Sequence, residues 1–199
     1  MEQAIRLLTI LEEAGFEAFI IGGAVRDMLM HVKPHDFDIV TSARPEQVIS
    51  VLGDANIETT GIIGKSFGVV VAIVDGKHYE VATYRKERYG ADSHRPEEVI
   101  YADTLEEDVK RRDFTVNGMA INRYKEVIDL VGGRRDIKHK VLRTIGNPTE
   151  RFQEDALRLF RACRFVAKLD FLPDKALLAA MPKAFHRVSG LSLERVRNE

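Results

Sequence analysis

The stretch FIIGGAVRDMLMHVKPHDFDIVTSA, residues 19–43, decides the fold because it joins two apolar runs through a glycine pair and a short amphipathic segment. The first run predicts a strand that ends at Gly22–Gly23, and the residues after it predict a helix. DFDIV, residues 36–40, predicts a second strand. Because alternate side chains of a strand face the same way, we expect Asp36 and Asp38 to point to one face together.

Two carboxylates on one face of a strand repel each other and resist burial unless a cation lies between them. The glycine pair leaves backbone N–H groups free at a helix start, where they can hold phosphate. Arg26, one turn later, would add a guanidinium for a triphosphate, and Glu80 would be a third carboxylate if its strand lies beside Asp38. These residue types together indicate a two-metal nucleotidyl-transfer site. For the D-x-D pair alone, a capping Asp36 and a solvent-exposed Asp38 remain the alternative.

The rest of the chain predicts a small sheet followed by helices. Residues 67–85 predict a β-hairpin with a turn at Asp75–Gly76, and the polar residues 85–103 predict a long, mobile loop. Thr104 and Glu107 form a capping box that predicts a helix start, and Asn147, Pro148 and Glu150 predict another. From about residue 134 the strand signals fade, and EDALRLFRACRFVAKL, residues 154–169, predicts one continuous helix. The last predicted helix has no C-terminal stop signal, so we expect the chain to end inside a longer helical region.

Composition and charge limit the class of protein. The single cysteine, Cys163, cannot form an internal disulfide, and no uncharged run has membrane-spanning length, so we expect a soluble, cytoplasmic protein. Residues 1–133 hold 15 basic and 23 acidic residues, whereas residues 134–199 hold 15 and 8. The acidic N-terminal part would suit metal ions and the basic C-terminal part would suit a polyanion. Two solvated faces would give the same counts.

Six ordered segments resemble the motifs of class II tRNA nucleotidyltransferases, which comprise CCA-adding enzymes and related bacterial poly(A) polymerases. The segments are GGAVRD, DFD, YEVATYR, RRDFTVNGMA, the glycine pair at 132–133, and EDALRLFRACRF. The resemblance implies an α+β fold in which a small mixed or antiparallel nucleotidyltransferase-type sheet with helices precedes an all-α segment. It also implies a catalytic head over residues 1–140 and a helical neck over residues 141–199, truncated at its C-terminus.

The resemblance further implies roles for individual residues. Asp36, Asp38 and Glu80 would be catalytic and would bind Mg²⁺. The nucleotide-binding residues would be Gly22, Gly23, Arg26, Arg112, Asp113, Asp155, Arg158, Arg161 and Arg164. Gly23 and Arg26 would contact the phosphates, and Asp155 and Arg158 would read the base.

The chemistry of Asp155 and Arg158 agrees with base reading. Cytosine and adenine both present an amino donor beside a ring-nitrogen acceptor, whereas uracil and guanine present the reverse pattern. From adjacent turns of one helix, Asp155 would accept from the amino group and Arg158 would donate to the ring nitrogen. The pair would then accept CTP and ATP and reject UTP and GTP. An ordinary i,i+3 salt bridge on a helix surface is the alternative.

We therefore expect an enzyme that adds C and A residues from CTP and ATP to the 3′ end of tRNA. Within the family, a poly(A) polymerase or an enzyme that adds only CC or only A is the alternative. Residues 85–103 resemble the flexible loop of members that add C, which disfavours A-only addition. Outside the enzyme class, a non-catalytic nucleotide- or RNA-binding module on this fold is possible, but such a module would be expected to lack one of the three carboxylates.

Overall fold

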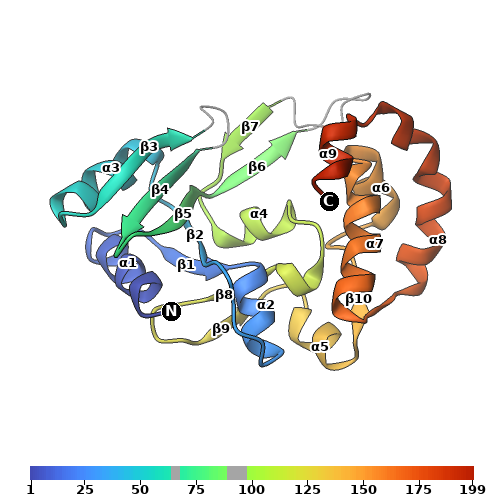
Figure 1. The fold of residues 1–199 in the computed structure, drawn as a ribbon, viewed down its shortest axis with the longest axis horizontal. Helices are drawn as coiled ribbons and strands as arrows, with labels where there is room; N and C mark the ends of the chain where they lie inside the picture. The colour runs from blue at the N-terminus through green and yellow to red at the C-terminus, as the bar shows by residue number, and fades with distance from the viewer. Residues whose placement is uncertain (64–67, 89–97) are drawn as a thin grey trace.

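The computed structural model describes residues 1–63, 68–88 and 98–199, and its largest element is a seven-stranded mixed sheet (Figure 1). The strand order is β3-β4-β5-β2-β1-β8-β9. Their bounds are β1 Ala18–Ile21, β2 Asp38–Thr41, β3 Glu58–Ile63, β4 Val69–Val74, β5 Lys77–Thr83, β8 Met119–Ile121 and β9 Val127–Asp129. Strands β2 and β5 pair in parallel, and the other neighbours pair antiparallel. The expected α+β fold with a mixed sheet is confirmed.

Helices cover both faces of this sheet because its central strands are apolar on both sides. Ile20 and Ile39 face a core shared with helices α1 (Glu2–Glu13), α2 (Gly23–Leu29) and α3 (Pro45–Asp54). Ile21 and Val40 face the opposite core, which includes Leu105 and Val109 of α4 (Leu105–Lys110). Both faces of the central strands are therefore buried, and polar groups are left at the ends of these strands.

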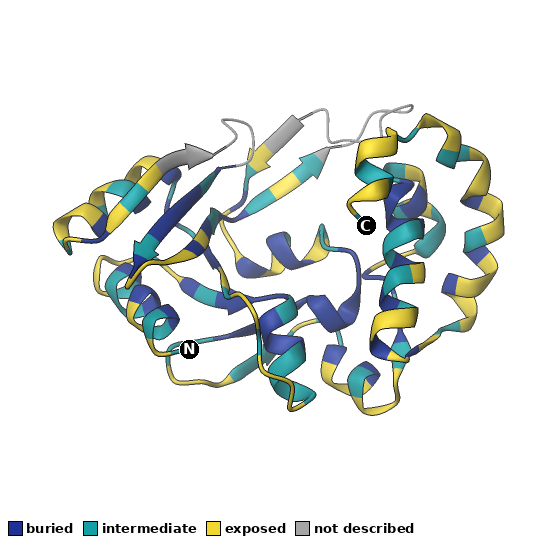
Figure 2. Ribbon diagram, in the orientation of Figure 1, coloured by how far each residue is buried: buried dark blue, intermediate teal, exposed yellow. Residues whose placement is uncertain are grey.

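The C-terminal third is helical and has a core of its own. Its helices are α5 Gly133–Lys138, α6 Pro148–Glu154, α7 Leu157–Leu169, α8 Lys175–Ala184 and α9 Leu193–Arg197. Two short strands, β10 Val141–Leu142 and β11 Leu172–Pro173, pair in parallel between these helices. Phe114, which follows α4, enters this core and meets Phe165 of α7 edge to face at 5.6 Å between ring centres. The inner side of α7 is buried and much of α8 is exposed (Figure 2).

Several expectations about local structure are confirmed. The predicted hairpin is β4–β5, and its turn residues Asp75 and Gly76 both have positive φ, 52° and 71°. The predicted start of α4 is also present, because the Thr104 hydroxyl accepts from the Glu107 N–H at 3.4 Å. The predicted start of α6 is present as well, with Asn147 capping the Thr149 N–H.

Other expectations were wrong, each for a physical reason. Residues 85–103 are not one loop: β6 (Arg85–Arg88) and β7 (Glu98–Tyr101) form an antiparallel pair, and the middle of the expected loop, residues 89–97, lies outside the described residues. Strand β6 has the sequence RKER and therefore shows no apolar alternation. Its side chains make ion pairs to α4, such as Lys86 with Glu107 at 2.5 Å. Strand β3 and helix α5 were not predicted. The continuous helix expected over residues 154–169 is broken at Asp155.

In the described part of the chain, no helix is both long enough and apolar enough to cross a membrane.

Gly133, the first residue of α5, packs closely against the segment that follows α4. A Cβ at Gly133 would lie 2.8 Å from Met119 Sδ and would overlap the backbone oxygen of Thr115. We expect Gly133→Ala to lower the free energy of unfolding by about 1–3 kcal/mol, because the contact includes backbone that cannot move aside. The measurement is urea denaturation of the variant and the parent protein.

Gly53→Ala is the matched control, because a Cβ at Gly53, in helix α3, meets nothing within 4 Å among the described residues apart from its own helix and chain neighbours. It should be neutral or should stabilise by up to about 1 kcal/mol, since alanine is the better helix former. Equal stability of the two variants would contradict the close packing at Gly133.

Candidate nucleotide-binding and active site

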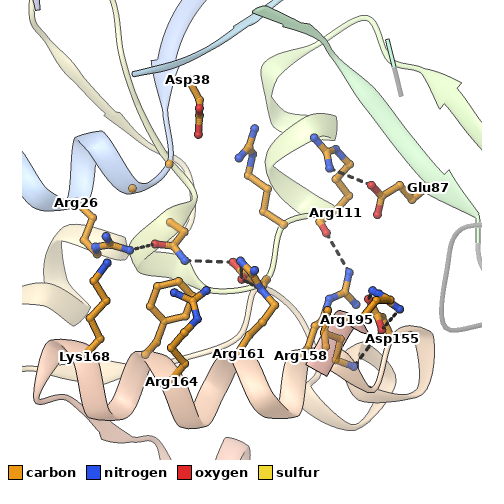
Figure 3. Close-up of a pocket in the computed structure, with 17 residues that line it drawn as sticks. Arg26, Asp38, Glu87, Arg111, Asp155, Arg158, Arg161, Arg164, Lys168 and Arg195 are labelled. Carbon is orange, nitrogen blue, oxygen red and sulfur yellow. Dashed lines mark hydrogen bonds and ion pairs between the residues drawn. The ribbon is translucent and has the colours of Figure 1, made fainter. Parts of the chain in front are cut away.

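A cavity of about 510 Å³ opens between the glycine turn after β1, the segment after α4, and helix α7 (Figure 3). Eight basic and four acidic side chains line it. The basic residues are Arg26, Arg111, Arg112, Arg158, Arg161, Arg164, Lys168 and Arg195, and the acidic ones are Asp38, Glu87, Asp113 and Asp155. The excess of cations would favour a multiply charged anion in this cavity.

Ten of the twelve predicted site residues line this one cavity, although they come from segments more than a hundred residues apart. They are Gly22, Gly23, Arg26, Asp38, Arg112, Asp113, Asp155, Arg158, Arg161 and Arg164. Of the two exceptions, Glu80 lies on the strand beside Asp38, and Asp36 lines a second cavity with Lys33 and His78.

The glycine turn brings backbone and charged groups close together. Gly22 has a φ of 83°, a conformation that favours glycine, and it forms the N-cap of α2. A Cβ on Gly22 would lie 4.0 Å from Asp38 Oδ2 and 3.8 Å from Arg112 Nη1. The turn, a carboxylate and a guanidinium therefore converge on one small space, which a phosphate group would suit.

Asp38 has like-charged neighbours. The parallel register pairs Ile39 with Val81, so Asp38 and Glu80 occupy adjacent positions just before this pair on the neighbouring strands. Burial raises the pKa of Asp38, the Glu80 charge raises it further, Arg112 opposes both, and Asp36 adds a smaller increase. Such mutual repulsion is what a bound cation would relieve.

The three carboxylates do not form a ready-made metal cluster. Within residues 1–63, 68–88 and 98–199, no three His, Cys, Asp or Glu side chains are grouped so that they could hold a metal ion. Strand β2 begins at Asp38, so Asp36 precedes it, and the strand alternation that was expected to align both carboxylates does not extend to Asp36.

Asp108 positions two cavity arginines and was not among the predicted site residues. Its carboxylate is fully buried and accepts from Arg111 Nε at 2.8 Å and from Arg112 Nε and Nη2 at 3.0 and 2.9 Å. Burial alone would raise the pKa of Asp108, but the charges and hydrogen bonds of Arg112 and Arg111 outweigh it and hold the pKa below its usual value. The i,i+3 and i,i+4 spacing from Asp108 to the arginine pair could have revealed this role.

Asp113 connects the segment after α4 to α2 and α7. It accepts from Arg161 Nε at 2.8 Å, from the Phe114 N–H at 2.7 Å and from Asn117 Nδ2 at 3.3 Å. Asn117 in turn accepts from Arg26 Nη1 at 2.6 Å. Burial would raise the pKa of Asp113, but Arg161 and these hydrogen bonds lower it below its usual range. Arg26 and Arg161, both predicted to bind the nucleotide, are thus oriented through one buried network.

Asp155 and Arg158 are close, but not on adjacent turns of one helix as expected. Asp155 has extended backbone, φ −146° and ψ 109°, between α6 and α7, because its Oδ1 accepts from the Leu157 N–H at 3.0 Å and so starts the new helix. Arg158 donates to Glu154 at 2.5 Å and to the Arg151 carbonyl at 2.8 Å. The surface salt bridge considered as an alternative is also wrong, since Arg158 is 6% exposed.

The segment at α9 supplies two charged residues that sequence reasoning missed. Arg195 Nη2 donates to Asp155 Oδ2 at 2.7 Å. The Glu199 carboxylate accepts from Arg161 Nη1 at 2.8 Å and from Arg164 Nε at 2.6 Å. No local periodicity marks these contacts, because the partners lie 35 to 40 residues apart in the sequence.

Comparison with known proteins places this geometry in a family. The family model described as poly A polymerase head domain matches residues 18–143, more than half of the chain. The chain belongs to this family. It is 43% identical over 197 residues to a CCA-adding enzyme of Lactobacillus delbrueckii subsp. bulgaricus, and the match covers 99% of this chain and 48% of that protein.

Solved structures of CCA-adding enzymes share the fold of this family member. That of Bacillus stearothermophilus in complex with CTP has a TM-score of 0.88 and 37% identity, covering 98% of this chain and 46% of its own. That of Thermotoga maritima complexed with tRNA has a TM-score of 0.81 and 25% identity, covering 99% of this chain and 45% of its own. The present chain therefore spans about half the length of the proteins it matches.

Asp108 provides a stability test of the arginine-positioning network in this family member. We expect Asp108→Asn to lower the free energy of unfolding at pH 7 by about 3 kcal/mol, because Arg111 and Arg112 lose a buried counter-charge. In the parent protein Asp108 contributes fully to the free energy of unfolding above the usual aspartate pKa of 3.8. This contribution is lost as pH falls through the lower pKa of the folded state. The variant should therefore lose less stability than the parent between pH 5 and pH 2.

Urea denaturation over that pH range measures both effects. Asp54→Asn, at the exposed end of α3, is the control and should follow the parent. If the free energy of unfolding depended on pH in the same way for the parent and Asp108→Asn, the assigned role of Asp108 would be contradicted.

Proposed function

We propose that this chain carries the nucleotidyl-transfer site of an enzyme that adds C and A residues from CTP and ATP to the 3′ end of tRNA. One cavity contains both Gly22 with Asp38, called here the transfer corner, and Asp155 with Arg158, the base-reading corner. This shared cavity is the observation that carries the proposal. A transfer site and a base-reading site would thus act on one nucleotide. The CTP-bound and tRNA-bound relatives support this choice of substrates.

The same proposal divides the chain by role. Residues 1–140 would act as the catalytic head and residues 141–199 as the neck that reads the base. The division follows the sheet and the helices, but the boundary is not a clean break, because Phe114 and Val116 pack into the core of the helical part. Work on tRNA 3′ ends would place the protein in the cytoplasm.

The donor set of the transfer corner fits Mg²⁺. Asp38, Glu80 and Asp36 offer carboxylate oxygens, the ligands that this cation prefers. Burial, and after it the charge of Glu80, raises the pKa of Asp38, and a bound cation would offset both effects. Bound divalent cations would activate the RNA 3′-hydroxyl and stabilise the leaving pyrophosphate. Asp38 and Glu80 would hold them from adjacent strands, and Asp36 would approach from the preceding loop.

The remaining residues bind and align the nucleotide. Arg26 and Arg112 would bind phosphate oxygens, and both are held in place by carboxylates or amides, so little ordering is needed on binding. At the other corner, Asp155 would accept from the amino group of cytosine or adenine. Alignment and charge stabilisation are sufficient for this reaction, and no covalent intermediate with the protein is needed.

One experiment tests the proposal against its alternatives. The protein is incubated with Mg²⁺, tRNA lacking its 3′ CCA and each labelled nucleoside triphosphate singly and in combination, and the products are sequenced. Addition of CCA is the expected result. Long A tracts would identify a poly(A) polymerase, CC or A alone a partial enzyme, and binding without transfer a non-catalytic module.

The carboxylates give the first mutational prediction. We expect Asp38→Ala and Asp36→Ala each to abolish nucleotide addition while the protein stays folded, since neither side chain is a core contact. Turnover in Mg²⁺ and circular dichroism measure the two properties, with Asp54→Ala as a control that should remain active. If either carboxylate variant kept near-parental turnover, the metal assignment would be wrong for that residue.

The second mutational prediction concerns Asp155. We expect Asp155→Ala to reduce discrimination between CTP and UTP by about 1–3 kcal/mol, because the acceptor for the amino group is lost. Transfer should persist at a lower rate, since Asp38 and Glu80 remain. The measurement is kcat/KM for CTP, ATP and UTP in the parent and the variant. Asp174→Ala, which removes a helix cap of α8 outside the cavity, is the control; an unchanged CTP:UTP ratio in Asp155→Ala would contradict base reading by this residue.

A further inference from the structure

Within the part of the chain that the structure describes, Lys168, in the last turn of α7, is the cavity cation whose charge has no protein partner. The seven arginines that line the cavity are bound by carboxylates, and several also by carbonyl or amide oxygens, as Arg161 is by Asp113 and Glu199. Among the described residues, Lys168 has neither an ion pair nor a side-chain hydrogen bond, and it is exposed to the cavity. A lysine ammonium is a compact charge with three donors, which suits a phosphate group.

The position of Lys168 defines one end of the cavity. Arg158, Arg161, Arg164 and Lys168 follow one another at intervals of three or four residues and so share one face of α7. Lys168 lies ten positions after Arg158, which corresponds to a rise of about 15 Å along the helix axis. In Figure 3 Lys168 points from α7 toward Arg26, away from Asp155.

The glycine turn sets the order of groups at this end. Gly22 lies by Asp38, and a Cβ on Gly23 would lie 3.5 Å from Arg26 Nη2. With the base at Asp155 and the reacting α-phosphate at Asp38, the rest of the triphosphate would extend past the turn to Arg26. Lys168 lies across the cavity from Arg26, at the place that the end of the triphosphate would reach.

We propose that Lys168 binds the terminal phosphate of the incoming nucleoside triphosphate and so fixes its direction in the cavity. This inference rests on the proposed function, because it assumes that the cavity binds a nucleoside triphosphate. Since Lys168 contacts the leaving part and not the base, it should contribute equally to CTP and ATP binding. It should contribute nothing to a nucleoside monophosphate.

Binding of CTP, CDP and CMP in Mg²⁺ by isothermal titration calorimetry tests the proposal. Lys168→Gln should weaken CTP binding about tenfold or more, because a charge-assisted contact is lost, and should leave CMP binding unchanged. Lys168→Arg should retain most of the CTP affinity. Lys183→Gln, which removes an exposed lysine of α8, is the matched control and should bind all three ligands as the parent does.

The outcomes separate this inference from the function on which it rests. If the parent protein binds CTP more tightly than CMP but Lys168→Gln binds CTP as tightly as the parent does, the role of Lys168 is wrong and the proposed function stands. An equal loss for CTP and CMP, or a change confined to the KM for tRNA, would also overturn it, because the contact would then not be to the terminal phosphate. If the parent does not bind CTP, both proposals fail.

Discussion

The buried carboxylate of Asp113 is the interaction on which the site depends. Its direct partners belong to the segment that follows α4 and, through Arg161, to helix α7. Asn117 extends the network to helix α2, because it also accepts from Arg26. A buried charge is stable only when its hydrogen bonds are satisfied, so the sheet and the C-terminal helices can meet only in an arrangement that brings these donors together. The neighbouring Phe114 adds the apolar part of the same junction by packing on Phe165.

The second constraint is the concentration of positive charge around the cavity. Arginines that close together would repel one another, and each is therefore bound by a carboxylate such as Asp108, Asp113 or Glu199. The pairing keeps guanidinium groups oriented before any ligand arrives, which lowers the ordering cost of binding. Phe165 contributes too, because the Arg164 guanidinium lies 4.4 Å from its ring centre. An anion that entered the cavity would therefore meet guanidinium groups that are already oriented, and it would not have to order them.

Sequence patterns predicted the parts of this structure that depend on local periodicity or on turn chemistry. The strands on either side of Gly22, the Asp75–Gly76 hairpin and the capped start of α4 all have such signals, and most of the site residues followed from the motifs. The break at Asp155 has no signal, because residues 154–169 have apolar spacing that suits an unbroken helix. The interruption depends on the Asp155 side chain, which accepts from the Leu157 N–H. Arg195 and Glu199 could not be placed either, since their ion pairs depend on how α9 folds back over α7. Strand β6 was missed because its sequence, RKER, has no apolar residue.

The break at Asp155 also bears on how this residue would act as a selective acceptor in the proposed function. A carboxylate has about four acceptor positions. The Leu157 N–H and the two Arg195 contacts, at 2.7 and 3.4 Å, occupy three of these positions and fix the plane of the group. Among the described residues no other donor reaches the group, so one position would remain for a single donor, such as the amino group of cytosine or adenine. A carbonyl placed there would face an oxygen with no proton between them. In an unbroken helix, the Leu157 N–H would bond to a backbone carbonyl and the Asp155 side chain would lose the contact that orients it. Base selection by this residue would therefore depend on the interruption of the helix as much as on the aspartate itself.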